Sequence, residues 1–274
     1  MTSKSYVAMF SDGVYLARLL LAYGIDPVTR TSYPSGDGQD MNLCMACTVW
    51  AGKEPNRDLY DRNVLLYAIT DRHLLPGDEP RRRAALASLA SGWARGGIDY
   101  LQIREKDLDA DELLLLAREV VAAVAEERTG IKVLLNGPAE IALEAGADGV
   151  HLPGNAAPDA VARALKLFAA AGRRAVISRA CHSAAEAAGG DAGLLLYAPV
   201  FEKTLPSHAT SGEALPGQGL SALAEACRAA GSTPVLALGG VTAENAAACV
   251  AAGAAGVAAI RLFLGAEWRK LRSL

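Results

Sequence analysis

The chain has 274 residues, of which 51% are hydrophobic, so an apolar core can form and wholesale disorder is excluded. A formal net charge of −3 and an aromatic content of 5% argue against a nucleic-acid-binding surface, which depends on positive charge and aromatic stacking. We therefore expect a cytoplasmic enzyme that acts on a small molecule, with neither a nucleic acid nor a membrane as its partner.

Residues 1–63 are predicted to be an N-terminal extension of unknown role. They contain turn-forming clusters such as Tyr33–Gly38 and show no sustained helix or strand period. The apolar stretch Val14–Tyr23 contains an arginine and is too short to cross a bilayer. Cys44 and Cys47 form a single C-x-x-C without the further ligands that a structural zinc needs, so we expect no metal there. The odd total of five cysteines is typical of reduced thiols.

From residue 64 onward, short β-rich runs alternate with segments of helical period. Eight runs are predicted to be strands: Val64–Thr70, Tyr100–Arg104, Lys132–Leu135, Gly149–Leu152, Ala175–Ser178, Leu194–Tyr197, Pro234–Leu238 and Val257–Ile260. The clearest helices between and after them are Pro80–Arg95, Ala110–Arg128, Pro158–Ala171, Leu220–Ala230, Ala243–Ala252 and the short Ala266–Ser273.

Eight βα units within residues 64–274 match the number and size of a (β/α)8 TIM barrel, an α/β fold. A doubly wound open sheet is the alternative, but the G-x-G-x-x-G that follows its first strand is missing. An internal repeat supports one recurring unit. Ala145–Val150 recurs as Ala252–Val257, with looser versions at Gly96–Tyr100 and Gly189–Leu194. In each, we expect the helix to end at a glycine in the left-handed conformation just before a buried strand.

Functional residues of such a barrel lie at the carboxyl ends of its strands. Gln102 and Arg104 alternate along one predicted strand, so both point to the barrel interior. A buried guanidinium needs a partner, and a ligand phosphate or carboxylate binds it in bidentate fashion. An ion pair with a core carboxylate is the alternative for Arg104.

The turn Gly239-Gly240 follows the seventh predicted strand and opens a predicted helix. Thr242 and Asn245 occupy the positions of a capping box, with Asn in place of Glu or Gln. Free backbone N–H groups in this turn, together with the loop after the eighth strand, predict a phosphate site.

Among the histidines, His182 follows the fifth predicted strand and is the candidate for proton transfer near neutral pH. His151 lies within a strand and is interpreted as a satisfied core histidine. His73 and His208 fall in predicted loops.

Taken together, these motifs resemble the thiamine phosphate synthase family, including its thiazole tautomerase branch. The resemblance runs from about residue 64 to residue 264 in one continuous order, and residues 1–63 lie outside it. The segments that carry it are Tyr67–Asp71, Gln102–Lys106, Ala145–Leu152, His182-Ser183, Pro199–Phe201, Gly239-Gly240 with Asn245, and Ala252–Ala254.

The resemblance implies a (β/α)8 barrel, and its synthases join an aminopyrimidine methyl pyrophosphate to a thiazole phosphate, releasing pyrophosphate with Mg2+. It implies the following contacts: Gln102, Arg104 and Lys106 with the pyrimidine and pyrophosphate, Asn136 with the pyrophosphate, and Gly239 and Gly240 with the thiazole phosphate. This sequence departs from the family pattern in three ways. Gly137 and Ala156 stand where the family usually has its Mg2+ carboxylates, and Ala180 and Arg261 replace two serines. The loop after the sixth predicted strand, which usually carries a lysine, differs in sequence, and Lys203 is the nearest lysine.

These departures favour a metal-independent thiazole tautomerase, in which His182 moves a proton on a carboxythiazole phosphate. The alternative is a Mg2+-dependent synthase, because Arg104-Glu105-Lys106 is intact, and Lys203 and Arg261 offer further positive charge. A third hypothesis is a non-catalytic regulator that binds thiazole phosphate or thiamine phosphate. A homo-oligomer is compatible with all three.

Overall fold

The computed structural model describes residues 64–189, 191–204 and 214–274. The N-terminal extension with Cys44 and Cys47, and His208 as well, lie outside the described residues. The described segments all belong to one compact unit, residues 56–274.

Eight strands form the barrel wall. Their bounds are β1 (Leu65–Ile69), β2 (Tyr100–Ile103), β3 (Lys132–Leu135), β4 (Gly149–Leu152), β5 (Val176–Cys181), β6 (Leu194–Tyr197), β9 (Val235–Leu238) and β10 (Gly256–Ala259). The largest difference from the prediction is β5, which continues beyond Ser178 because Arg179 and Cys181 still pair with β6. That pairing partner lies outside the segment's own sequence, so the local pattern does not contain it.

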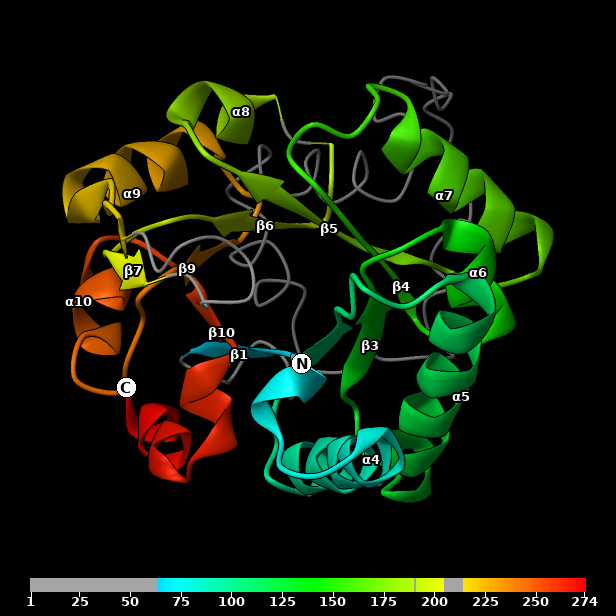
Figure 1. Ribbon diagram of the computed structural model, residues 1–274. Coiled ribbons are helices and arrows are strands. Elements are labelled where there is room, and N and C mark those ends of the chain that lie inside the picture. Colours follow the sequence, from blue (N-terminus) through cyan, green and yellow to red (C-terminus); the bar gives the residue numbers. More distant parts are fainter. Residues whose placement is uncertain (1–63, 190, 205–213) are drawn as a thin grey trace, which may run out of the picture. The chain divides into compact units, whose positions relative to one another are not determined.

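The strands are all parallel and close on themselves in the order β1-β10-β9-β6-β5-β4-β3-β2. Closure occurs between β1 and β10, from Leu65 opposite Gly256 to Ala68 opposite Ala259. This pairing confirms the TIM barrel and rules out the open sheet. Figure 1 shows the helices arranged around the strands.

The helices of the described residues lie outside the strands. They are α4 (Glu79–Arg95), α5 (Ala110–Glu126), α6 (Ala139–Glu144), α7 (Ala160–Ala170), α8 (Ala184–Ala188), α9 (Gly219–Ala229) and α10 (Ala246–Ala251). Aspartates start the two longest: Asp78 accepts the backbone N–H of Arg81 at α4, and Asp109 that of Glu112 at α5. Such side-chain acceptors satisfy N–H groups that have no partner within the helix.

Two predicted helices differ from the structure. The one expected from Ala243 begins only at Ala246, because Oδ1 of Asn245 accepts the N–H of Thr242 and holds the preceding turn outside the helix. The C-terminal segment is a 3-10 helix, η5 (Glu267–Ser273), rather than an α-helix. Two shorter 3-10 helices, η3 (Arg72–Leu74) and η4 (Arg261–Leu264), follow β1 and β10.

The internal repeat marks the joints between helices and strands. Gly97, Gly146 and Gly253 have φ values of 83°, 83° and 101°, as expected for left-handed glycines. At the fourth joint Gly189 has a φ of −85°, like the C-cap Gly96 at the first, and the glycine that corresponds to Gly97 is residue 190, which lies outside the described residues. The second glycine of the repeated segment lets two strands lie close together. A Cβ on Gly149 would lie 1.8 Å from the carbonyl oxygen of Val176 on the neighbouring strand.

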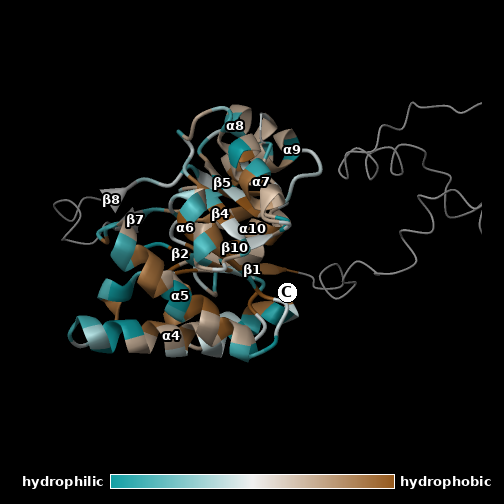
Figure 2. Ribbon diagram, turned by 90° about the vertical axis from the view of Figure 1, so that its right-hand side faces the viewer, coloured by the Kyte–Doolittle hydropathy of each residue, from teal (hydrophilic) through white to brown (hydrophobic). Residues whose placement is uncertain are grey.

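The apolar side chains form a core on both faces of the strands. One cluster fills the space between strands and helices, for example Leu101 with Leu116 and Val120. Another fills the barrel interior: Tyr67, Ile69, Leu194, Leu196, Leu236 and Ala258. Helices α4 and α5 carry hydrophobic and hydrophilic residues together (Figure 2), as amphipathic barrel helices do.

After β6 the chain forms a two-stranded antiparallel arm, β7 (Lys203–Thr204) and β8 (Ala214–Leu215), which the sequence analysis did not predict. The arm projects from one end of the barrel (Figure 2). Among the described helices, none is long and apolar enough to cross a membrane.

Candidate active site

Most of the predicted site residues gather at one end of the barrel. Because the eight strands are parallel, their carboxyl ends open on the same side. Gln102 lies in β2, and the others follow strand ends: Arg104 and Lys106 after β2, Asn136 after β3, His182 after β5, Gly239 and Gly240 after β9, and Arg261 after β10. Lys203 differs, because it lies in the arm strand β7.

Arg104 and Lys106 form a pair of positive charges at this end. Arg104 is half-buried and Lys106 is exposed, and within the described residues neither forms an ion pair with a carboxylate. The charge of Arg104, helped by burial, lowers the pKa of Lys106 below its ordinary value. Two cations that repel each other and have no protein anion between them favour a multiply charged anionic ligand.

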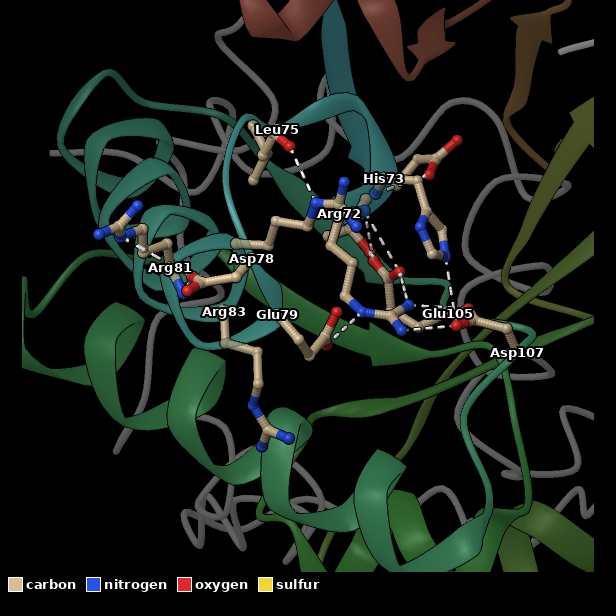
Figure 3. Close-up of polar contacts among 12 residues, drawn as sticks. Arg72, His73, Leu75, Asp78, Glu79, Arg81, Arg83, Glu105 and Asp107 are labelled. Carbon is tan, nitrogen blue, oxygen red and sulfur yellow. Dashed lines mark hydrogen bonds and ion pairs between the residues drawn. The ribbon is translucent and has the colours of Figure 1, made fainter. Parts of the chain in front are cut away.

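Behind this pair, a buried cluster holds the β2 loop in place (Figure 3). Glu105 is 3% exposed and accepts hydrogen bonds from the Thr70 hydroxyl at 2.6 Å and from Nη1 of Arg72 at 3.0 Å. Arg72 also binds both carboxylate oxygens of Asp107, at 2.7 and 2.5 Å, and its Nε donates to Glu79 at 2.7 Å. Arg72, which follows β1, therefore links α4 through Glu79 and the loop after β2 through Glu105 and Asp107.

The electrostatics of the cluster follow from burial and pairing. Burial raises the pKa of Glu105 above its ordinary value, and the hydrogen bonds from Thr70 and Arg72 oppose that rise. The guanidinium of Arg72 holds the pKa of Asp107 well below its usual range. Glu105 follows the end of β2, and neither its burial nor its pairing with Arg72 was predicted from the sequence. The sequence does contain a pattern that predicts the direction of Glu105. Alternate residues of a strand point to the same side, so Glu105 shares the helix-facing side of β2 with Leu101 and Ile103.

Below the charged pair, Gln102 is 1% exposed and joins a buried polar chain inside the barrel. The Tyr67 hydroxyl donates to Oε1 of Gln102 at 3.1 Å and lies 3.0 Å from the hydroxyl of Ser178. Nδ1 of His151 lies 2.9 Å from the same Ser178 hydroxyl. His151 is therefore a buried and hydrogen-bonded histidine, as expected. Tyr67 and Ser178 were not predicted as site residues.

His182 is exposed at the barrel mouth. Its Nδ1 lies 2.8 Å from the carbonyl oxygen of Ala198, which only accepts, so Nδ1 carries the hydrogen of this bond. In the neutral ring Nε2 is then the basic nitrogen. Gly154 packs against the ring, since a Cβ there would lie 3.1 Å from Cδ2 of His182. His73, by contrast, lies in η3, with its Nε2 3.2 Å from Asp107.

Both glycines of the Gly239-Gly240 turn have left-handed backbone conformations, with φ values of 95° and 65°. Nδ2 of Asn245 donates to the carbonyl oxygen of Gly240 at 2.9 Å, and its Oδ1 accepts the N–H of Thr242 at 2.8 Å. The predicted capping contact is thus made by Asn245. The N–H groups of Gly240 and Val241 donate to no acceptor within the described residues, as in an anion-binding nest.

The residues at this end do not fit the family's usual Mg2+ site. Gly137 and Ala156 supply no carboxylate at the two positions that usually hold the ion. The nearby carboxylates of Glu105 and Asp107 are already bound by Arg72. In the part of the chain that is described, no three His, Cys, Asp or Glu side chains are grouped to hold a metal.

Comparison with known proteins places the chain in a family. Residues 66–263 match the family described as "Thiamine monophosphate synthase". The chain belongs to this family. A "Putative thiamine-phosphate synthase" of Geobacter sulfurreducens is 40% identical over 198 residues, covering 71% of this chain and 84% of the relative. A "Thiamine-phosphate synthase" of Methanoculleus marisnigri is 37% identical over 204 residues, covering 73% and 87%.

A solved member shows the same fold. The thiamine phosphate pyrophosphorylase of Pyrococcus furiosus aligns with a TM-score of 0.57 at 22% identity, over 77% of this chain and 93% of its own. The family model and the two relatives above confirm the family expected from the sequence. The chain is an enzyme of the thiamine monophosphate synthase family, and this family places it in thiamine biosynthesis.

Proposed function

We propose that the chain condenses an aminopyrimidine methyl pyrophosphate with a thiazole phosphate to form thiamine phosphate and pyrophosphate. The names of its relatives support the synthase over the tautomerase that the sequence departures favoured. The observation that carries the proposal is the pair Arg104 and Lys106, which has no carboxylate partner within the described residues. Such a pair is suited to a pyrophosphate, which carries several negative charges.

In this reaction the bond between the methylene carbon and the pyrophosphate oxygen breaks, and the thiazole nitrogen bonds to that carbon. The electron pair of the broken bond leaves with the pyrophosphate, so negative charge grows beside Arg104 and Lys106. Fixed cations at that place stabilise the transition state more than the ground state. The amide of Asn136 is half-buried beside β2 and is proposed to contact the same pyrophosphate.

The second substrate is assigned to the opposite side of the mouth. The N–H groups of the Gly239-Gly240 turn are proposed to bind the thiazole phosphate, with Arg261 after β10 adding positive charge. Lys203 at the start of the arm is proposed as a further cation. No step of the proposed reaction passes through Mg2+, because the family's carboxylate positions are Gly137 and Ala156 here.

The tautomerase remains a second candidate because of the geometry at His182. With Nδ1 donating to Ala198, Nε2 is free to take a proton from one carbon of a carboxythiazole phosphate and return it to another. This proton transfer needs no Mg2+, so it does not require the carboxylates that Gly137 and Ala156 replace. The non-catalytic regulator is a third hypothesis, and turnover in either assay removes it. The cytoplasmic location and a homo-oligomer stay predictions.

Pyrophosphate release tests the proposal directly. The full chain is incubated with both substrates, with Mg2+ and with a chelator in parallel, and we expect turnover. Arg104→Met should lower kcat/KM at least 100-fold, which is typical for loss of one group that stabilises transition-state charge. Arg163→Met, an exposed arginine on α7 paired with Asp159, is the control and should change it less than twofold. No pyrophosphate under either condition rejects the synthase.

Exchange of solvent deuterium into a carboxythiazole phosphate separates the second candidate. If exchange proceeds without pyrophosphate release and is lost in His182→Ala, the chain is a tautomerase. If neither reaction proceeds but thiazole phosphate binds, the regulator hypothesis is favoured.

A further inference from the structure

Arg72 binds three carboxylates with a single guanidinium (Figure 3). Nη1 and Nη2 donate to the two carboxylate oxygens of Asp107 at 2.7 and 2.5 Å, Nη1 also donates to Glu105 at 3.0 Å, and Nε donates to Glu79 at 2.7 Å. The Arg72 side chain is 4% exposed, so the guanidinium is shielded from water. Among the described residues, no other arginine or lysine forms an ion pair with Glu105 or Asp107.

The loop after β2 alternates in charge along the sequence. Arg104 and Lys106, the cation pair, are positive, and Glu105 and Asp107 between and after them are negative. Lys106 and Asp107 are the central residues of a turn, in which the N–H of Leu108 donates to the carbonyl oxygen of Glu105 at 3.4 Å. Opposite charges this close attract each other, so the sequence by itself lets each carboxylate neutralise the cation beside it.

The structure separates the two signs. Both carboxylates are bound by Arg72, and Nε2 of His73 also lies 3.2 Å from Asp107. Neither member of the cation pair forms an ion pair within the described residues. The pKa of Lys106 agrees with this separation, since the charge of Arg104 and burial lower it, whereas a paired carboxylate would raise it.

A released Asp107 would oppose an anion at the cation pair. Its side chain is 47% exposed and adjoins Lys106, so nothing buries it away from that ammonium once Arg72 is removed. A bound anion would then compete with Asp107 for Lys106 and would also be repelled by the carboxylate charge. The availability of the cations therefore depends on what holds the carboxylates.

We propose that Arg72 is a positioning residue of the anion site that the cation pair forms. By binding Glu105 and Asp107, it keeps both carboxylates away from the cation pair, which stays available to a pyrophosphate. Arg72 itself touches no ligand. The inference rests on the proposed function, because it takes pyrophosphate as the anion, while the role of Arg72 comes from the contacts described above.

Calorimetry with inorganic pyrophosphate tests the proposal without turnover. Arg72→Met alone leaves Glu105 buried without its partner, which is strongly destabilising. The test variant is therefore Arg72→Met/Glu105→Gln, whose new amide oxygen can still accept from Thr70. It keeps the net charge and releases only Asp107. We expect at least tenfold weaker binding, because like charges placed together are costly. Arg81→Met, an exposed arginine of α4, is the control and should bind within twofold of the unaltered protein.

A third substitution distinguishes charge from shape. Adding Asp107→Asn to the test variant removes the released carboxylate, so pyrophosphate affinity should return to within threefold of the unaltered protein. A loop that is merely displaced would stay weak, because this change restores no lost contact. Adding Asp111→Asn instead, an exposed carboxylate in the first turn of α5, is the matched control for net charge and should restore nothing.

The pKa of Lys106 is a second measurement, made on the protein without ligand. Carbon-13 methylated lysines are titrated by NMR, and Lys106→Arg identifies the Lys106 signal. In the test variant this pKa should rise, because Asp107 then pairs with the ammonium and favours its charged form. It should fall again when Asp107→Asn is added. An unchanged pKa in the test variant overturns the proposal.

The outcomes separate this inference from the proposed function. If the variants bind pyrophosphate as expected, the inference holds even where the two substrates yield no product, which rejects the synthase alone. If the unaltered protein does not bind pyrophosphate, both fall. Unchanged affinity in the test variant, or no recovery with Asp107→Asn, overturns the inference whatever the turnover.

A variant that retains Arg72 covers the case in which circular dichroism shows the test variant to be unfolded. Asp107→Asn in the otherwise unaltered protein should bind pyrophosphate within threefold, because Arg72 already holds that carboxylate away from the cation pair. Binding that is tenfold tighter would show that Asp107 opposes the anion despite Arg72, and this overturns the inference.

Discussion

The hydroxyl of Thr70 donates to Oε1 of Glu105 over 2.6 Å and at the same time accepts the backbone N–H of Arg104 over 2.9 Å. One side chain at the end of β1 therefore fixes two consecutive residues at the end of β2. Since Thr70 is only 1% exposed, no water replaces these bonds when the hydroxyl is removed. The position of the Arg104 backbone thus depends on the buried hydroxyl of Thr70.

Thr70→Val keeps the shape and removes the hydroxyl. It should lower the free energy of unfolding by about 1–3 kcal/mol, because a buried N–H and a buried carboxylate each lose a partner. It should also raise the Kd for inorganic pyrophosphate several-fold, since Arg104 is less well placed. Urea unfolding and calorimetry measure the two effects. Thr70→Ser keeps the hydroxyl and is the control; equal pyrophosphate binding in the Val and Ser variants contradicts the prediction.

Arg72→Met removes the guanidinium that neutralises Glu105. The unfolding free energy should fall by about 3–5 kcal/mol, because a carboxylate with 1% of its side chain exposed is left without its partner. The control is Arg81→Met on the surface of α4, where the ion pair with Asp78 is long, at 3.8 Å, and exposed. We expect at most about 0.5 kcal/mol there. Similar urea midpoints for the two variants would show that the buried cluster contributes little.

His151 predicts a stability that depends on pH. Its pKa is about 4 in the folded protein and about 6.5 in the unfolded chain, so between these values the unfolded chain binds more protons. Stability from this group is therefore fully present above pH 6.5 and is lost as the pH falls towards 4, by about 3 kcal/mol at most. Other groups titrate in the same range, so the measurement is the difference between the unaltered protein and His151→Asn. That difference should shrink from pH 7 to pH 4.5, and a constant difference contradicts the prediction.

Gly240 has a backbone and a neighbour that both exclude a side chain. Its φ is 65°, and an added Cβ would lie 2.5 Å from the carbonyl oxygen of Glu202 in the loop after β6. Gly231 has nearly the same φ, 62°, but nothing lies within 4 Å of its Cβ position. Gly231→Ala should cost about 1 kcal/mol from the backbone alone.

Gly240→Ala should cost clearly more, because the loop after β6 must move, and it should weaken thiazole phosphate binding at least tenfold. Urea unfolding and calorimetry on both variants test this. If both variants lose the same unfolding free energy, the close approach of Glu202 to Gly240 does not add to the cost, and the prediction is wrong.

Much of this protein was predictable from its sequence alone. Buried strands such as Lys132–Leu135 and Leu194–Tyr197 are short apolar runs between helical segments, so their bounds follow from local pattern. The placement of Gln102, Arg104 and His182 at one end of a barrel also follows, because parallel strands share the direction of their carboxyl ends. The left-handed glycines of the repeat, such as Gly97 and Gly146, were predictable too, because few residues other than glycine adopt a positive φ without strain.

Only the tertiary structure decided which residues meet across the barrel. The bond from Thr70 to Glu105 and the chain from Gln102 to His151 join residues 27 to 111 positions apart, and no local pattern encodes such contacts. Glu105 is adjacent to Arg104 in sequence yet faces the helices, where Arg72 neutralises it, while Arg104 forms no ion pair within the described residues. The sequence thus determined the fold and the end of the barrel that carries the site. Packing decided which charges remain free there, because a buried charge must find its partner in space rather than along the chain.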